Sequence, residues 1–197
     1  MEPKITYEAG QSHLDQEELA GLKLVGIKDW TEILNQESKG IAKTVVWTEK
    51  NQFSTEKIFT ELFIREIHKR MFGEVWTWAG KYRLSNKTLG VEKGLISKEL
   101  KQLFNNIKFW IESESYDADE ITIRFIHRLM QIQCFSNGNA RHAKLMADIV
   151  IENVFNGDIF TWGESLNDSK LQREKFLEAL KKADKGKMED LVKLARL

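Results

Sequence analysis

Apolar side chains recur at helical spacing along most of this chain. Phe59, Phe63, Ile67 and Met71 follow one another at intervals of four residues, so they share one face of a helix. The only proline is Pro3, and no later proline interrupts a helix. The same periodicity predicts a series of helices, which span roughly residues 29–49, 54–73, 97–111, 117–132, 139–151, 169–183 and 187–196, with a shorter one near 14–22.

The stretch between Gly73 and Gly94 departs from the helical pattern. It is rich in tryptophan, threonine and valine, and Gly80 and Gly90 interrupt it. This composition favours a loop followed by a short β-hairpin across about residues 82–92. The predicted fold class is therefore all-α, a helical bundle with a small β-hairpin.

Composition limits the classes of protein to which the chain can belong. Its 197 residues suit one domain, which we place over 28–197, after a polar and irregular segment over 1–27. The 30 basic and 30 acidic residues cancel, which argues against direct binding to nucleic acid or a membrane surface through bulk charge. The single cysteine, Cys134, excludes an intramolecular disulfide and a cysteine-based zinc site. We see no signal peptide and no membrane-spanning stretch, so the expected location is the cytoplasm.

One loop interrupts two apolar helices with small and polar residues: QCFSNGNARHAK, residues 133–144. Gly138 can adopt a positive φ, and the N–H groups of the helix that follows would point back into the loop. Arg141 adds a planar guanidinium suited to phosphate, and Lys144 lies on the same helix face. The predicted phosphate-binding residues are Gly138, Asn139, Ala140, Arg141 and Lys144. The alternative is an ordinary helix–helix turn that Asn137 or Asn139 caps.

This loop resembles the Fic-domain signature His-Pro-Phe-x-x-Gly-Asn-Gly-Arg-x-x-Arg, and Phe135, Gly138, Asn139 and Arg141 match it in register. The resemblance extends over about residues 25–195 and is most similar to the Fic branch called mobile mystery protein B. The segments that carry it are IHKRMFGEVWTWAGKYR (67–83), RFIHRLMQIQCFSNGNARHAKLMADIVI (124–151), FTWG (160–163) and ALKKAD (179–184).

The resemblance implies a reaction, the transfer of AMP from ATP to a hydroxyl side chain of a target protein. In the family a histidine acts as general base, the glycine-rich loop and its first arginine hold the phosphates, and an acidic loop residue holds Mg²⁺. A hairpin called the flap pairs with the target protein. The corresponding residues here are Leu84, Ser85, Asn86, Lys87, Thr88, Leu89, Gly90 and Val91.

Several positions depart from the family motif. Gln133 stands at the position of the histidine, and an amide has no usable basicity near neutral pH. Asn137 stands at the acidic metal position, and Ala140 and Lys144 replace the second glycine and the second arginine. We therefore predict a Fic-fold protein of the protein adenylyltransferase type in which transfer is weak or absent. The alternative is a non-catalytic module that binds a nucleotide or a protein, or a scaffold that keeps only the fold.

The resemblance also implies regulation and a partner. Many family members carry an inhibitory helix whose glutamate pairs with the second arginine, and the helix predicted near 31–41 offers Glu37. Ile33 and Ser38 do not fit the inhibitory pattern, so Glu37 could pair with Lys144 or could face solvent. Members of the branch resemble one half of a pair with a helix-turn-helix protein, which makes such a protein the expected partner.

Overall fold

The computed structural model describes residues 14–27, 29–163 and 169–197. Its elements are α1 (Gln16–Leu19), α2 (Trp30–Glu49), α3 (Thr55–Ile58), α4 (Glu61–Phe72), the 3₁₀ turn η1 (Lys93–Leu95), α5 (Ile96–Glu112), α6 (Ala118–Ile132), α7 (Asn139–Phe155), α8 (Ser169–Ala183) and α9 (Glu189–Ala195). Residues 1–13 of the predicted N-terminal segment lie outside the described residues, as does Lys28 at the start of the predicted domain. Within the described ranges every helix is too short or too polar to bridge a lipid bilayer.

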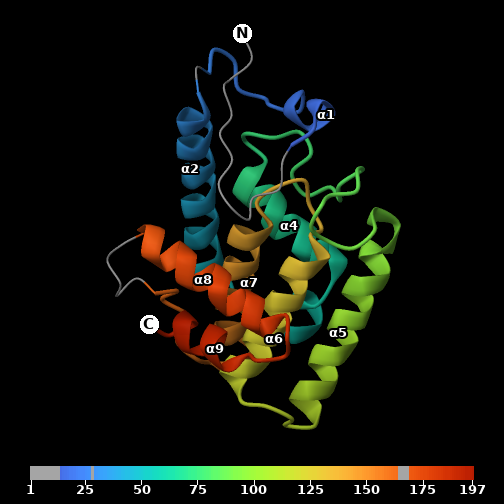
Figure 1. Ribbon diagram of the computed structural model, residues 1–197, viewed down its shortest axis with the longest axis vertical. Helices are drawn as coiled ribbons and strands as arrows, with labels where there is room; N and C mark the ends of the chain where they lie inside the picture. The colour runs from blue at the N-terminus through green and yellow to red at the C-terminus, as the bar shows by residue number, and fades with distance from the viewer. Residues whose placement is uncertain (1–13, 28, 164–168) are drawn as a thin grey trace.

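Helices α6 and α7 pack along each other at the centre of the bundle (Figure 1). Helix α5 packs against α6, whereas α4 packs against both α7 and α2. Helices α8 and α9 pack together, and α9 also contacts α6. The core side chains that these helices share are almost inaccessible to solvent, among them Ile64, Ile67, Phe125, Met146 and Val150. The loop between α6 and α7 therefore starts and ends on the central pair of helices.

Capping residues fix several helix ends where the sequence predicted them. Asp117 accepts a hydrogen bond from the N–H of Glu120 at 2.8 Å at the start of α6, and Ser54 accepts one from the N–H of Lys57 at 3.4 Å at the start of α3. The one helix predicted after Ser54 is divided in two, because Thr60 adopts an extended conformation and caps α4. Threonine side chains compete with the helix backbone for hydrogen bonds, which is why Thr60 can end one helix and start the next.

The predicted β-hairpin over residues 82–92 is wrong, because this segment is an irregular loop and no strand occurs in the described ranges. The backbone N–H groups near its two ends bond to the last residue of α6 and to the connection that follows it. The N–H of Arg83 donates to the carbonyl of Cys134 at 3.0 Å, and the N–H of Val91 donates to that of Ile132 at 3.4 Å. A hairpin would use such backbone groups for pairing between its own strands, so tertiary bonding replaces the expected ladder.

The described part of the N-terminal segment, residues 14–27, packs against the chain that precedes this loop. The N–H of Lys23 donates to the carbonyl of Val75 at 2.8 Å, and the N–H of Thr77 donates to that of Gly21 at the same distance. These bonds hold α1 at the end of the molecule where the α6–α7 connection lies (Figure 1).

Candidate functional site

The connection between α6 and α7, residues 133–138 and here called the motif loop, begins and ends in left-handed backbone conformations. Gln133 has φ 52° and ψ 63°, and Gly138 has φ 76°. Glycine is required at the second position, because a Cβ there would lie 2.7 Å from the ring of Phe72. The turn at Gly138 leads directly into α7, whose first N–H groups have no acceptor within the helix. The motif loop therefore faces a helix N-terminus, which favours anions.

Phe135 anchors the motif loop in the core. Its buried ring stacks on that of His68 with centroids 3.7 Å apart, and the ring of His142 meets it edge-on at 5.3 Å. His68 also holds the loop backbone: its Nδ1 accepts from the N–H of Gly80, and its Nε2 donates to the carbonyl of Asn137, both at 3.0 Å. The two bonds define one tautomer of the neutral ring, and burial lowers the pKa of His68 well below 6.5.

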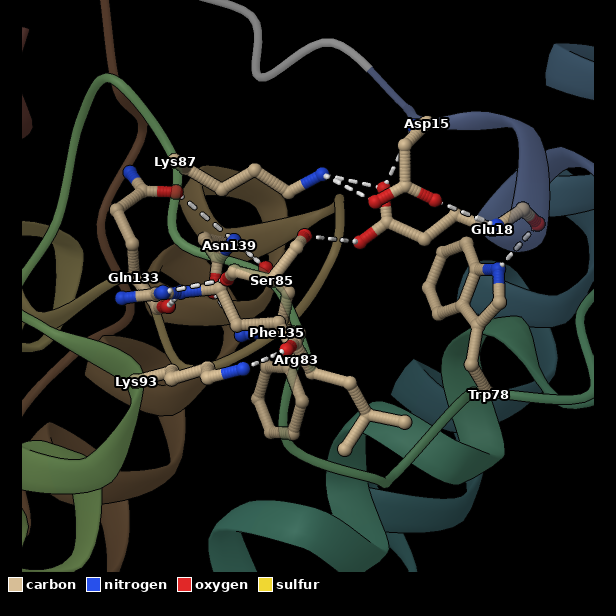
Figure 2. Close-up of polar contacts among 11 residues, drawn as sticks. Asp15, Glu18, Trp78, Arg83, Ser85, Lys87, Lys93, Gln133, Phe135 and Asn139 are labelled. Carbon is tan, nitrogen blue, oxygen red and sulfur yellow. Dashed lines mark hydrogen bonds and ion pairs between the residues drawn. The ribbon is translucent and has the colours of Figure 1, made fainter.

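Asn139, the first residue of α7, ties the motif loop together through its carboxamide (Figure 2). Its Oδ1 accepts from the N–H of Phe135 at 3.0 Å, and its Nδ2 donates to the carbonyl of the same residue at 2.8 Å and to Oε1 of Gln133 at 2.9 Å. The Nε of Arg83 donates to the carbonyl of Gln133 at 2.6 Å. Gln133 thus acts as an acceptor in a polar network, and its amide cannot take a proton from a hydroxyl.

No other histidine or cysteine of the described residues supplies a base at the motif loop. His142 is 1% exposed, its Nε2 donates to the carbonyl of Ile64 at 3.0 Å, and burial lowers its pKa to about 4. His127 is also buried and lies 2.9 Å from the carboxylate of Asp184. Burial raises the pKa of the Cys134 thiol far above its usual value. These side chains are therefore closed to a substrate hydroxyl.

Arg141, in the first turn of α7, is paired with a buried acid. Its Nη1 lies 2.6 Å from Oε2 of Glu37, and Nε1 of Trp76 donates to the other carboxylate oxygen at 2.6 Å. The side chain of Glu37 is 2% exposed, whereas that of Arg141 is 36% exposed. Glu37 does not face solvent, and its partner is Arg141 and not Lys144. From α2 it neutralises the cation that the sequence predicted as a phosphate ligand.

Lys144 lies away from the motif loop, between α7 and α8. Its ammonium is 5.0 Å from the ring centroid of Trp162 and 4.5 Å from that of Phe176. Burial lowers the pKa of Lys144, while the nearby carboxylate of Asp148 acts in the opposite direction. In this position the side chain joins α8 to the central helices.

The residues at the motif loop do not fit a protein-held Mg²⁺. Mg²⁺ is usually bound through one or two carboxylates together with substrate phosphates. Asn137, at the predicted metal position, is neutral, and its Oδ1 accepts from the N–H of Gly138 at 2.6 Å. The described ranges hold no group of three or more histidine, cysteine, aspartate or glutamate side chains that could bind a metal ion. Ala140 is exposed at the start of α7.

The segment over residues 84–91, here called the flap loop, covers Gln133. Gly90 has φ 111°, and a Cβ at this position would lie 2.7 Å from Cβ of Gln133. Leu84 and Leu89 are 81% and 49% exposed, so the loop presents apolar side chains to solvent. Its exposed members are Leu84, Asn86, Thr88, Leu89 and Gly90.

Sequence reasoning missed Glu18, which contacts the flap loop from α1. Its carboxylate pairs with the ammonium of Lys87 and lies 3.5 Å from Oγ of Ser85. Asp15 and Glu18 form a reciprocal capping box at the start of α1. The Asp-x-x-Glu spacing could have indicated a helix start at Asp15, but no sequence pattern indicated the contact with the flap loop.

Comparison with known proteins found similarity to a family model over part of the chain. Residues 58–151 match the model of a family described as the Fic/DOC family. A comparison with curated proteins found no match.

Several solved structures resemble the chain in fold. The BepC protein of Bartonella tribocorum with bound AMPPNP is 17% identical, with a TM-score of 0.69 over 92% of this chain and 97% of that one. The N-terminal Fic domain of a VirB-translocated Bep effector protein from Bartonella quintana with bound ADP is 17% identical, with a TM-score of 0.66 over 87% of this chain and 86% of that one. Fic-1 from C. elegans is 18% identical, with a TM-score of 0.68 over 90% of this chain and 51% of that one. At these identities the likeness establishes the fold.

Proposed function

We propose, from the match of residues 58–151 to the Fic/DOC family model, that the protein is of the adenylyltransferase type, binds nucleotide phosphates at the motif loop and transfers AMP weakly or not at all. The observation that carries the proposal is Gln133, which stands at the position of the family histidine. Its carboxamide accepts from Asn139 and has no basicity. Loss of a positioned general base lowers a rate by about 10²–10⁴.

The proposed ligand is ATP or a related nucleotide. The N-terminus of α7, which follows the turn at Gly138, offers N–H donors to a phosphate, and Arg141 offers positive charge. Two of the similar structures hold AMPPNP and ADP. Lys144 would reach a phosphate only by leaving the rings of Trp162 and Phe176, so we assign it no phosphate contact. We also assign no protein ligand to Mg²⁺, because the motif loop carries no carboxylate.

We further propose that Glu37 competes with the nucleotide for Arg141. The ion pair joins the two side chains at 2.6 Å, and the indole of Trp76 holds the carboxylate in place. A phosphate that approached Arg141 would meet the negative charge of Glu37 and a guanidinium that is already engaged. Glu37 would therefore weaken nucleotide binding until it moves away.

The second candidate function is a module that binds a protein without turnover. The observation that favours it is the pair of exposed leucines on the flap loop, Leu84 and Leu89, since binding residues are often found on loops held by a rigid scaffold. We propose the flap loop as the docking site for a target protein. Membership of the mobile mystery protein B branch and a helix-turn-helix partner stay predictions from the sequence resemblance.

A titration with ATP and a labelling assay test the proposed function together. We expect saturable binding of ATP by calorimetry, and no transfer of label from α-labelled ATP to the purified protein or to a cell lysate. The contribution of Arg141 is measured by comparing the Glu37→Gln variant with the double variant Glu37→Gln/Arg141→Ala. Both variants lack the buried carboxylate of Glu37, so they differ only in the side chain at position 141. Label that appears with the natural chain and is lost in the double variant would contradict impaired transfer. Equal affinity in the matched pair would contradict the assignment of Arg141.

Substituting glutamine for Glu37 should tighten ATP binding by about ten-fold, or ~1.4 kcal/mol. The amide keeps an acceptor for the indole of Trp76 but removes the charge that opposes phosphate at Arg141. The measurement is the dissociation constant for ATP by calorimetry. Glu74→Gln, which removes an exposed carboxylate paired with Lys43, is the control and should leave the affinity unchanged. A similar gain in the control would assign the effect to net charge.

A further inference from the structure

Helix α1 is a single turn, so it depends on contacts outside the helix for its stability. Glu18 provides several of these contacts. Its Oε2 accepts from the N–H of Asp15 at 2.9 Å and pairs with the ammonium of Lys87. Its Oε1 lies 3.5 Å from Oγ of Ser85, and its backbone carbonyl accepts from Nε1 of Trp78 at 2.9 Å. Figure 2 shows Glu18 where α1 meets the flap loop.

The pair of Glu18 and Lys87 is largely shielded from water. Each of the two side chains is 9% exposed, and Asp15 adds a second carboxylate 3.8 Å from the same ammonium. Removal of Lys87 would take the cation away from the buried carboxylate of Glu18, and removal of Glu18 would take away the nearer of the two carboxylates beside Lys87. Both changes are unfavourable in a place shielded from water. The structure can avoid that situation by opening locally, since short loops and terminal helices open more readily than the core. We therefore expect the flap loop to open when the pair of Glu18 and Lys87 is broken.

The opposite side of the flap loop is fastened to the motif loop. The buried guanidinium of Arg83 donates to the carbonyls of Gln133, Ser85 and Val91. Gly90 lies directly against the side chain of Gln133. Ser85 belongs to both sets of contacts, because its carbonyl accepts from Arg83 while its hydroxyl faces Glu18. A change at α1 can therefore reach Gln133 through one short stretch of chain.

We propose that α1 is a latch that keeps the flap loop closed over Gln133. With the Glu18–Lys87 pair intact, residues 84–91 lie against the motif loop. When the pair breaks, the flap loop moves away and uncovers Gln133 and the carbonyls to which it was bonded. The purpose of this opening, which is to admit a segment of a target protein, rests on the proposed function; the latch itself rests on contacts within the chain.

Hydrogen exchange followed by mass spectrometry, without nucleotide or target, tests the latch. Glu18→Gln keeps the shape and the capping acceptor but removes the charge, and Lys87→Met removes the cation and keeps an apolar stem. In each variant exchange at the bonded amides of Arg83 and Val91 should accelerate at least about ten-fold, while α6 and α7 keep their protection. In the double variant the logarithm of the exchange rate should rise by less than the sum of the rises in the two single variants, because both side chains belong to one interaction.

Lys43→Met breaks the exposed pair with Glu74 and is the matched control, in which exchange near the flap loop should stay unchanged. Unchanged exchange in both latch variants would overturn the proposal. Equal acceleration throughout α6 and α7 would also overturn it, because that result would mean global destabilisation. The exchange measurement needs no ATP, so the two proposals can fail separately. If the protein binds no ATP but exchange at Arg83 and Val91 accelerates in the two variants, the proposed function is refuted and the latch is supported. The converse result would refute the latch alone.

Discussion

Replacing Gln133 by histidine should raise the rate of AMP transfer from ATP to a protein hydroxyl by about 10²–10⁴ over the natural chain. The imidazole would stand at the end of α6, beneath Gly90 of the flap loop. Histidine tolerates the left-handed backbone better than most residues, so φ 52° at this position is compatible with it. It would supply a base that titrates near neutral pH, which an amide lacks. The measurement is the initial rate at which label from α-labelled ATP enters protein.

Gln131→His is the matched control, because it places the same imidazole two residues earlier on α6. We expect no gain of transfer from it. Both variants are best compared in the Glu37→Gln background, in which Arg141 is released from its buried partner. A rate that stays at the natural level in Gln133→His with Arg141 free would show that a missing base does not limit transfer. Asn137 and its neutral carboxamide would then be the next position to change.

The difference in free energy of unfolding between the natural chain and a His142→Gln variant should fall by about 3 kcal/mol as the pH falls from 6.5 to about 4. Burial lowers the pKa of His142 to about 4 in the folded chain, against 6.5 in a solvated histidine. Below pH 6.5 the unfolded chain therefore binds a proton that the folded chain excludes until about pH 4. The contribution of the neutral ring to stability is fully present above pH 6.5 and is lost as the pH falls through this window.

Glutamine at position 142 can still donate to the carbonyl of Ile64 and does not titrate, so it isolates the protonation of His142. The natural chain must be compared with the His142→Gln variant because Asp148 changes the free energy of unfolding with pH in the opposite direction. Burial raises the pKa of Asp148 to about 7, so its contribution is present at low pH and is lost as the pH rises through about 7. Urea unfolding of both chains across the window gives the difference. A difference that does not change with pH would refute the prediction.

Much of the helical framework could be predicted because its signals are local. The four-residue recurrence of Phe63, Ile67 and Met71 on α4 depends on neighbours within one or two turns, and so does the cap at Asp117. The predicted hairpin failed for the opposite reason. The chain between Arg83 and Val91 has residues suited to strands, but its end groups bond to carbonyls at Ile132 and Cys134, far away in the sequence.

The sequence by itself determined the helices, the motif loop and the identity of the side chain where a base would stand, Gln133. Only the tertiary structure decided which partner each long charged side chain takes. Arg141 pairs with Glu37 from 104 residues away, while Lys144 lies over aromatic rings near α8. A flexible charged side chain can reach several partners, and the choice depends on which one the packing brings within a few ångströms and shields from water. Such proximity is a property of the assembled bundle, and spacing along the chain does not encode it.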